Sequence, residues 1–236
     1  MKIITTASYE ETAREAAKVI LDELAAKPDL LIGLATGETA VGLYQNMIAA
    51  CNAGTADFSR ARTVNLDEYI GCGVEDSYRY FMETQLFNHI NIPKENITIA
   101  DRTNDADAEV ARMRAFFEKN RVDIQLLGMG PNGHIGFNEP DDTLQSLTHW
   151  QKLTEETIAA NARFFKSPDD VPRKAITMGM GDIMKAKKIL MVIKGESKRE
   201  CLRQLLEGNT VDPKNPSTFI LMHPDVTLVC EKSLIS

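Results

Sequence analysis

The sequence predicts an α/β fold in which a single open, mainly parallel sheet is flanked by helices. Short apolar runs typical of buried parallel strands, such as residues 30–35 and 124–127, alternate with longer segments of helical period. Both runs lead into glycine-containing turns of the kind that mark strand ends. The chain has no internal repeat, low-complexity tract or linker, so we expect residues 1–236 to form a single domain.

The first half of the chain opens with an expected strand over residues 2–5 and a helix that follows it. Ser8 is placed to cap this helix, Glu11 occupies the capping-box position, and Pro28 stops the helix. The strand over 30–35 comes next. The other elements expected here are a helix after Thr39, a strand over 61–66, a helix capped by Asp76 or Ser77, an extended segment over 97–100 and a helix over 105–119.

The second half begins with the strand over 124–127 and a glycine-rich loop over 128–140. We expect a flap over about 141–165, because residues 141–150 have no clear period and a polar helix from about 154 follows them. The remaining expected elements are strands over 175–180 and 188–193 with a short helix between them, a helix ending near 206, a short helix over 217–222 and a strand over 226–230.

Composition and charge limit the function. The net charge of −7 argues against a broad surface for nucleic acid or an anionic membrane, although a local phosphate pocket remains compatible with it. No apolar run reaches the length of a membrane span, and the N-terminus lacks a signal-peptide core, so we expect a cytoplasmic protein. The four cysteines are scattered, which indicates reduced thiols in or near the core.

The glycine-rich loop carries the most informative side chains. Asn132, His134 and Glu139 lie in this loop, which contains four glycines and directly follows a buried strand. An imidazole near a carboxylate at a strand end is typical of an acid–base pair. The alternative is a glycine-rich turn with a solvated histidine, and a lone Gly-x-Gly would favour that alternative.

Two further strand ends carry groups of similar interest. The turn over Thr36–Thr39 precedes a helix, where free N–H groups and the helix dipole favour an anion, and the turn over Lys194–Lys198 repeats the arrangement with basic residues. Asp67 and Glu68 follow the strand over 61–66. An adjacent Asp-Glu pair is commonly a solvated loop, but its place at the expected ligand edge also fits a functional carboxylate.

Several separated blocks resemble the glucosamine-6-phosphate deaminase (isomerase) family over almost the whole chain. The blocks are Leu34–Thr39, Val64–Tyr69, Gly128–Pro140, Ile158–Phe165, Val171–Pro172, Ala175–Gly179 and Gly195–Lys198, in the family's order. The related 6-phosphogluconolactonases share a glycine-rich loop, but Phe137–Pro140 and Asn65–Tyr69 are similar to the deaminase branch. The resemblance implies a modified Rossmann-like fold.

The resemblance also implies an activity, the conversion of glucosamine 6-phosphate and water to fructose 6-phosphate and ammonia without a metal or organic cofactor. By position, Asp67 resembles the base that moves a proton between C2 and C1. His134 resembles the residue that opens the sugar ring at O5, and Asn132 and Glu139 resemble its orienting partners. The residues that resemble the phosphate site are Thr36, Gly37, Thr39, Arg163 and Lys198.

The chain departs from the family pattern at several positions. Asn132 stands where many members have Asp, Ala40 where Pro is usual and Leu147 where Arg is frequent. The residues that do not reproduce the allosteric phosphate site of the regulated hexamers are Asp142, Thr143, His149 and Gln151. The chain also ends soon after its last strand. We therefore expect a monomer or small homo-oligomer that an N-acetylated sugar phosphate does not activate.

Two alternative functions stay open at this point. The first is the same reaction on galactosamine 6-phosphate, because the C4 epimer requires only a changed contact in the pocket. The second is a catalytically silent sugar-phosphate sensor, which the intact Asp67, His134 and Glu139 disfavour.

Overall fold

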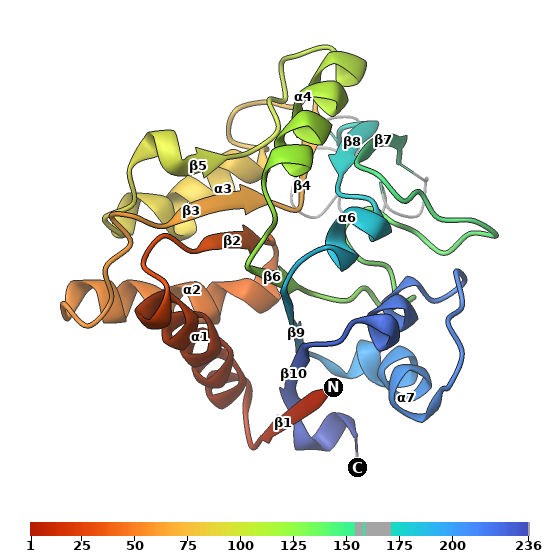
Figure 1. Ribbon diagram of the computed structural model, residues 1–236. Coiled ribbons are helices and arrows are strands. Elements are labelled where there is room, and N and C mark those ends of the chain that lie inside the picture. The colour runs from red at the N-terminus through yellow and green to blue at the C-terminus, as the bar shows by residue number, and fades with distance from the viewer. Residues whose placement is uncertain (154–157, 159–170, 236) are drawn as a thin grey trace.

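Seven parallel strands form the central sheet of the computed structural model, which describes residues 1–153, 158 and 171–235 (Figure 1). The strand order is β1-β10-β9-β6-β2-β3-β5, and all of the pairs are parallel. The strands are β1 Lys2–Thr6, β2 Leu31–Leu34, β3 Arg62–Asn65, β5 Ile97–Thr98, β6 Ile124–Leu127, β9 Lys188–Ile193 and β10 Val226–Glu231. The expected mainly parallel α/β fold is therefore confirmed.

Helices connect these strands largely where the sequence predicts them. They are α1 Tyr9–Ala26, α2 Glu38–Asn52, α3 Tyr78–Gln85, α4 Ala106–Lys119, α6 Met180–Met184 and α7 Arg199–Glu207. Short 3-10 helices span Phe87–His89, Lys94–Asn96, Glu196–Lys198, Pro216–Met222 and Lys232–Leu234. The expected cap of α1 is present, since the Ser8 side chain accepts a hydrogen bond from the Glu11 N–H at 3.3 Å.

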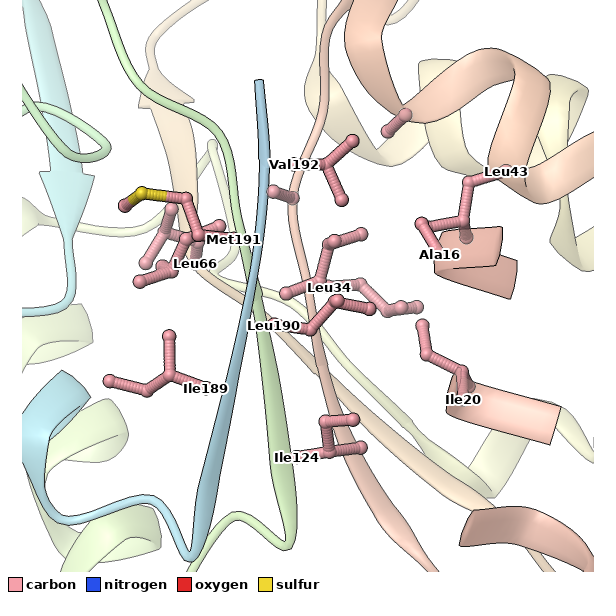
Figure 2. Close-up of a cluster of buried hydrophobic side chains, with 14 of the residues drawn as sticks. Ala16, Ile20, Leu34, Leu43, Leu66, Ile124, Ile189, Leu190, Met191 and Val192 are labelled. Carbon is pink, nitrogen blue, oxygen red and sulfur yellow. The ribbon is translucent and has the colours of Figure 1, made fainter. Parts of the chain in front are cut away.

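The core lies on both faces of the sheet because side chains alternate along each strand. Leu190 and Val192 of β9 point toward α1 and α2, whereas Ile189 and Met191 point to the opposite face (Figure 2). The larger hydrophobic cluster also includes Ile20 of α1, Leu34 of β2, Leu43 of α2 and Ile124 of β6, all fully or almost fully buried. Both faces of the central strands are thus covered by packed side chains, as parallel sheets require.

A second sheet stands beside the first and was not anticipated. It contains β4 Asp67–Ile70, β8 Lys174–Thr177 and β7 His149–Lys152, in the antiparallel order β4-β8-β7. No strand was expected over residues 149–152, where β7 lies. The side chains of β7 alternate between half-buried and exposed, but three of the four are polar and Trp150 lies on the exposed side, so no apolar alternation marks the strand in the sequence.

Three other expectations concern a helix, the cysteines and a membrane span. The helix expected from about residue 154 lies, except for Ile158, outside the described residues. All four cysteines are free thiols, and Cys72, Cys201 and Cys230 are buried as expected. None of the helices within the described ranges is long and apolar enough to cross a membrane.

Candidate active site

Four adjacent strands bring the candidate residues to one edge of the sheet. β9, β6, β2 and β3 are consecutive in the sheet and parallel, so their carboxyl ends lie side by side. The segments that follow these ends are residues 194–198, 128–140, 35–39 and 66–67. Ligands of open α/β sheets bind at this edge.

Asp67 begins β4 directly after the chain leaves the central sheet. Leu66 joins the two sheets, since its N–H donates to the Leu34 carbonyl at 2.8 Å and its carbonyl accepts from the Met178 N–H at 2.8 Å. The Asp67 side chain is only 8% exposed, and its Oδ1 has no hydrogen-bond partner among the described residues. Burial, together with the neighbouring Glu68 carboxylate, raises the pKa of Asp67 to about 8. Such a carboxyl group is suited to accept and return a proton near neutral pH.

The Glu68 carboxylate, unlike Oδ1 of Asp67, is hydrogen-bonded to backbone N–H groups. It is completely buried, and its carboxylate accepts hydrogen bonds from the N–H groups of Tyr69 at 2.8 Å, Tyr78 at 2.7 Å and Arg79 at 2.8 Å. Two of these N–H groups belong to the first turn of α3, where an anion is stabilised by the helix dipole. Glu68 therefore fixes α3 beside β4. Burial raises the pKa of Glu68, and the three N–H donors oppose that shift.

Three aromatic rings connect β4 to the glycine-rich loop. Tyr69 lies 4.7 Å from Tyr78 and 5.5 Å from Phe137 between ring centroids, and Tyr78 stacks on Phe137 at 6.1 Å. The Phe137 N–H also donates to the Thr177 hydroxyl at 3.2 Å. These contacts hold the end of the loop against β4 and β8.

The glycine-rich loop brings its three polar side chains together. The Asn132 amide Nδ2 donates to Glu139 Oε2 at 3.0 Å, and the His134 N–H donates to Asn132 Oδ1 at 3.2 Å. His134 Nδ1 lies 3.3 Å from the same Glu139 oxygen, within ion-pair distance of a protonated imidazole. Glu139 thus faces both partners, which places a carboxylate where it orients and stabilises an imidazole that gains a proton.

Close packing explains two of the glycines in this loop. A Cβ at Gly130 would lie 2.3 Å from His134 Cε1, so only glycine leaves room for the imidazole. Gly133 has φ of 85°, and a Cβ there would lie 2.0 Å from Asn215 Oδ1. The Ser217 N–H donates to the Gly133 carbonyl at 2.9 Å, and the Ser217 hydroxyl donates to Asn215 at 2.6 Å. The buried segment around Asn215 therefore packs against the glycine-rich loop and holds it in place.

The turn between β2 and α2 presents a helix N-terminus to the same edge. Gly37 is the N-cap of α2 with φ of 99°, and the Ala40 N–H donates to its carbonyl at 3.1 Å. The first N–H groups of a helix have no partner within the helix and favour an anion. Glu38 is exposed, as expected for a carboxylate that avoids this anion site. Lys198 lies half-buried at the start of α7, on the turn that follows β9, two strands away from β2.

The structure thus places most of the expected site residues at one edge of the central sheet, and one expected residue lies outside the described part of the chain. Asn132, His134 and Glu139 contact one another directly, and Asp67 and the two turns come from adjacent strands. Arg163 lies outside the described residues. The supporting roles of Asn215 and Ser217 had no signal in the sequence, because these residues are far along the chain from the loop they hold.

The fold and the ligand edge define an α/β protein that binds a small molecule at the carboxyl ends of its parallel strands. The chain belongs to the family of glucosamine-6-phosphate isomerases and 6-phosphogluconolactonases, whose family model matches residues 5–229. This confirms the family resemblance.

Comparisons with individual proteins agree with the family. Two relatives named glucosamine-6-phosphate deaminase are 46% identical to the chain, from Thermoanaerobacter pseudethanolicus with 100% of the chain and 94% of the relative covered, and from Clostridium perfringens with 98% and 97% covered. A solved structure of a monomeric glucosamine-6-phosphate deaminase has a TM-score of 0.95 at 40% identity, covering 100% of this chain and 99% of that one. A 6-phosphogluconolactonase from Trypanosoma brucei has a TM-score of 0.78 at 16% identity, with 99% and 97% covered, and shares the fold.

Proposed function

We propose that this protein is a glucosamine-6-phosphate deaminase, which converts glucosamine 6-phosphate and water to fructose 6-phosphate and ammonia. The observation that carries the proposal is Asp67, a buried carboxyl group with a pKa raised to about 8, on the same sheet edge as the His134–Glu139 pair. The proposal is further supported by relatives of that name at 46% identity over nearly their whole length. The lactonases of known structure lie well below this identity.

The chemistry assigns one proton transfer to each of two groups. His134 takes the role of opening the sugar ring by moving the proton between O1 and O5, and Glu139 and Asn132 hold the imidazole for this step. Asp67 then removes the proton from C2 while O1 takes up a proton, which gives an enolamine, and it delivers its proton to C1, which leaves an iminium at C2. Water adds to C2, and ammonia and one proton leave, so that C2 becomes the ketone carbon of fructose 6-phosphate. A base with a pKa near the working pH is suited to give and take the same proton.

Phosphate binding is assigned to the two strand-to-helix turns. Thr36, Gly37 and Thr39 offer hydroxyl and N–H donors at the start of α2, and Lys198 supplies a cation from the turn after β9. Arg163 is proposed as a second cation on the family resemblance. Anchoring the substrate by its phosphate fixes the position of C2 relative to Asp67, which contributes to rate as well as to affinity.

The partner of this site is therefore a small amino-sugar phosphate, and we infer that one subunit suffices for the reaction. The relative of known structure that is similar over the full chain is described as monomeric.

The proposal is tested by measuring ammonia release from glucosamine 6-phosphate, with galactosamine 6-phosphate and 6-phosphogluconolactone as parallel substrates. We expect ammonia and fructose 6-phosphate from the first and little turnover of the other two. Turnover of the lactone alone would overturn the proposal. Faster release from the galactosamine epimer would reassign the substrate while keeping the reaction.

A further inference from the structure

A tyrosine at the start of α1 reaches into the first turn of α2. The Tyr9 hydroxyl lies 3.0 Å from the Glu38 carbonyl, 3.2 Å from the Thr39 carbonyl and 3.1 Å from the Gly42 nitrogen. It accepts from the Gly42 N–H and donates to the carbonyls, so it stands between groups that pair directly in a regular helix. The two helices pack side by side in Figure 1.

The fit between the two helices depends on a missing side chain. A Cβ at Gly42 would lie 2.9 Å from both Tyr9 Oη and Ala13 Cβ, so glycine leaves the space that the hydroxyl occupies. Glycine in a helix interior costs about 0.5–1 kcal/mol relative to alanine. The close approach of Tyr9 explains why glycine stands at this position despite that cost.

Further contacts hold the start of α1 and the Tyr9 ring in place. Thr12, in the same turn of α1, shares a 2.6 Å hydrogen bond with the Thr6 hydroxyl, which in turn donates to the Cys230 carbonyl at 3.2 Å, so the start of α1 is tied to the sheet. On its other side, Lys194 Nζ lies 3.8 Å from the centroid of the Tyr9 ring. Lys194 opens the turn that carries Lys198.

We infer that Tyr9 is a positioning residue for the phosphate site, because its hydroxyl fixes the first turn of α2 while its ring holds Lys194 and the turn that leads to Lys198. One side chain thereby sets the distance between the two turns assigned to the phosphate. This inference rests on the proposed function. It adds a residue that contacts neither phosphate nor sugar and acts through the backbone of residues 38–42 and through Lys194.

The test compares Tyr9→Phe with Tyr80→Phe, a matched control on the exposed surface of α3. Tyr9→Phe keeps the ring and removes only the hydroxyl. We expect its KM for glucosamine 6-phosphate to rise about threefold to tenfold with kcat within about twofold, as loss of one hydrogen-bonded group implies. The inhibition constant of inorganic phosphate should rise by the same factor. Lys194→Met should raise both constants about twofold to fivefold, as loss of a cation–π contact implies.

Each outcome decides the matter. Parallel increases in KM and in the phosphate inhibition constant, absent in Tyr80→Phe, support the positioning role. A lower melting temperature for Tyr9→Phe with both constants unchanged would show a purely structural tyrosine and overturn it, as would a fall in kcat alone. If the wild-type protein releases no ammonia, the proposed function fails, and direct titration of inorganic phosphate into wild type and Tyr9→Phe still decides the role of Tyr9.

Discussion

Replacing Asp67 with Asn should increase the stability of the protein relative to wild type, and this increase should be larger at neutral pH than at mildly acidic pH. The Asp67 carboxyl group is buried, and its pKa is raised to about 8 in the folded protein, compared with about 3.9 in an unfolded chain. The folded state therefore binds this proton more tightly than the unfolded state does. Its contribution to stability is largest below the unfolded pKa and is lost as the pH rises toward 8.

The size of the effect follows from the two pKa values. Between pH 5 and pH 7 the unfolded carboxyl group is mostly ionised while the folded one remains mostly protonated, so wild type loses about 2–3 kcal/mol of stability from Asp67 alone. Asp67→Asn has no such group to titrate. The difference in unfolding free energy between variant and wild type should shift in favour of the variant by about that amount over this pH interval.

The assay is urea denaturation followed by circular dichroism at several pH values, with Asp29→Asn as the control. Asp29 is exposed, so its replacement should leave the pH dependence of wild type unchanged. Parallel stability curves for wild type and Asp67→Asn between pH 5 and pH 7 would refute the reasoning, because Asp67 would then titrate normally. The same variant should lose at least about two powers of ten in kcat, because an amide cannot accept the C2 proton.

Three further predictions concern phosphate binding, the glycine-rich loop and regulation. Lys198→Ala should raise KM for glucosamine 6-phosphate about tenfold or more, measured by ammonia release, because a charge-assisted bond to phosphate contributes about 1.5–3 kcal/mol; an unchanged KM would remove Lys198 from the site. Gly133→Ala should lower the unfolding free energy by about 2 kcal/mol or more and reduce kcat, since a Cβ would meet Asn215 Oδ1 at 2.0 Å and φ is 85°; urea denaturation and ammonia release measure both, and wild-type values would contradict the packing. Initial rates should be hyperbolic in glucosamine 6-phosphate and unaffected by N-acetylglucosamine 6-phosphate. Allosteric activation requires a second binding site coupled to the first, and the chain does not reproduce the residues of the family's allosteric phosphate site. A Hill coefficient clearly above one that the acetylated sugar phosphate shifts would contradict this.

The sequence predicts those parts of the fold that depend on local patterns. Apolar runs such as residues 124–127 identify the central strands, and the Ser8 cap identifies the start of α1. The grouping of the site was also predictable, because the carboxyl ends of parallel strands share one edge. Each of these signals lies within a few residues of the element it describes.

The parts that escaped prediction depend on contacts between distant segments. β7 is a strand only because it pairs with β8, and its own residues carry no apolar alternation. The Asp67–Glu68 pair looks uniform in sequence, yet Glu68 caps α3 while Asp67 stays without a hydrogen bond to its Oδ1 among the described residues. Packing across the chain therefore gives two neighbouring carboxyl groups different environments, which their adjacent positions in the sequence do not reveal.

The most direct test of Asp67 as the base follows the hydrogen at C2. Glucosamine 6-phosphate labelled with deuterium at C2 is incubated with wild type, Asp67→Asn and Asp29→Asn, and loss of the C2 label and ammonia release are recorded together. We predict that wild type and Asp29→Asn remove the label and release ammonia, and that Asp67→Asn does neither at a rate within a hundredfold of wild type. Removal of the label by Asp67→Asn at the wild-type rate would contradict the assignment.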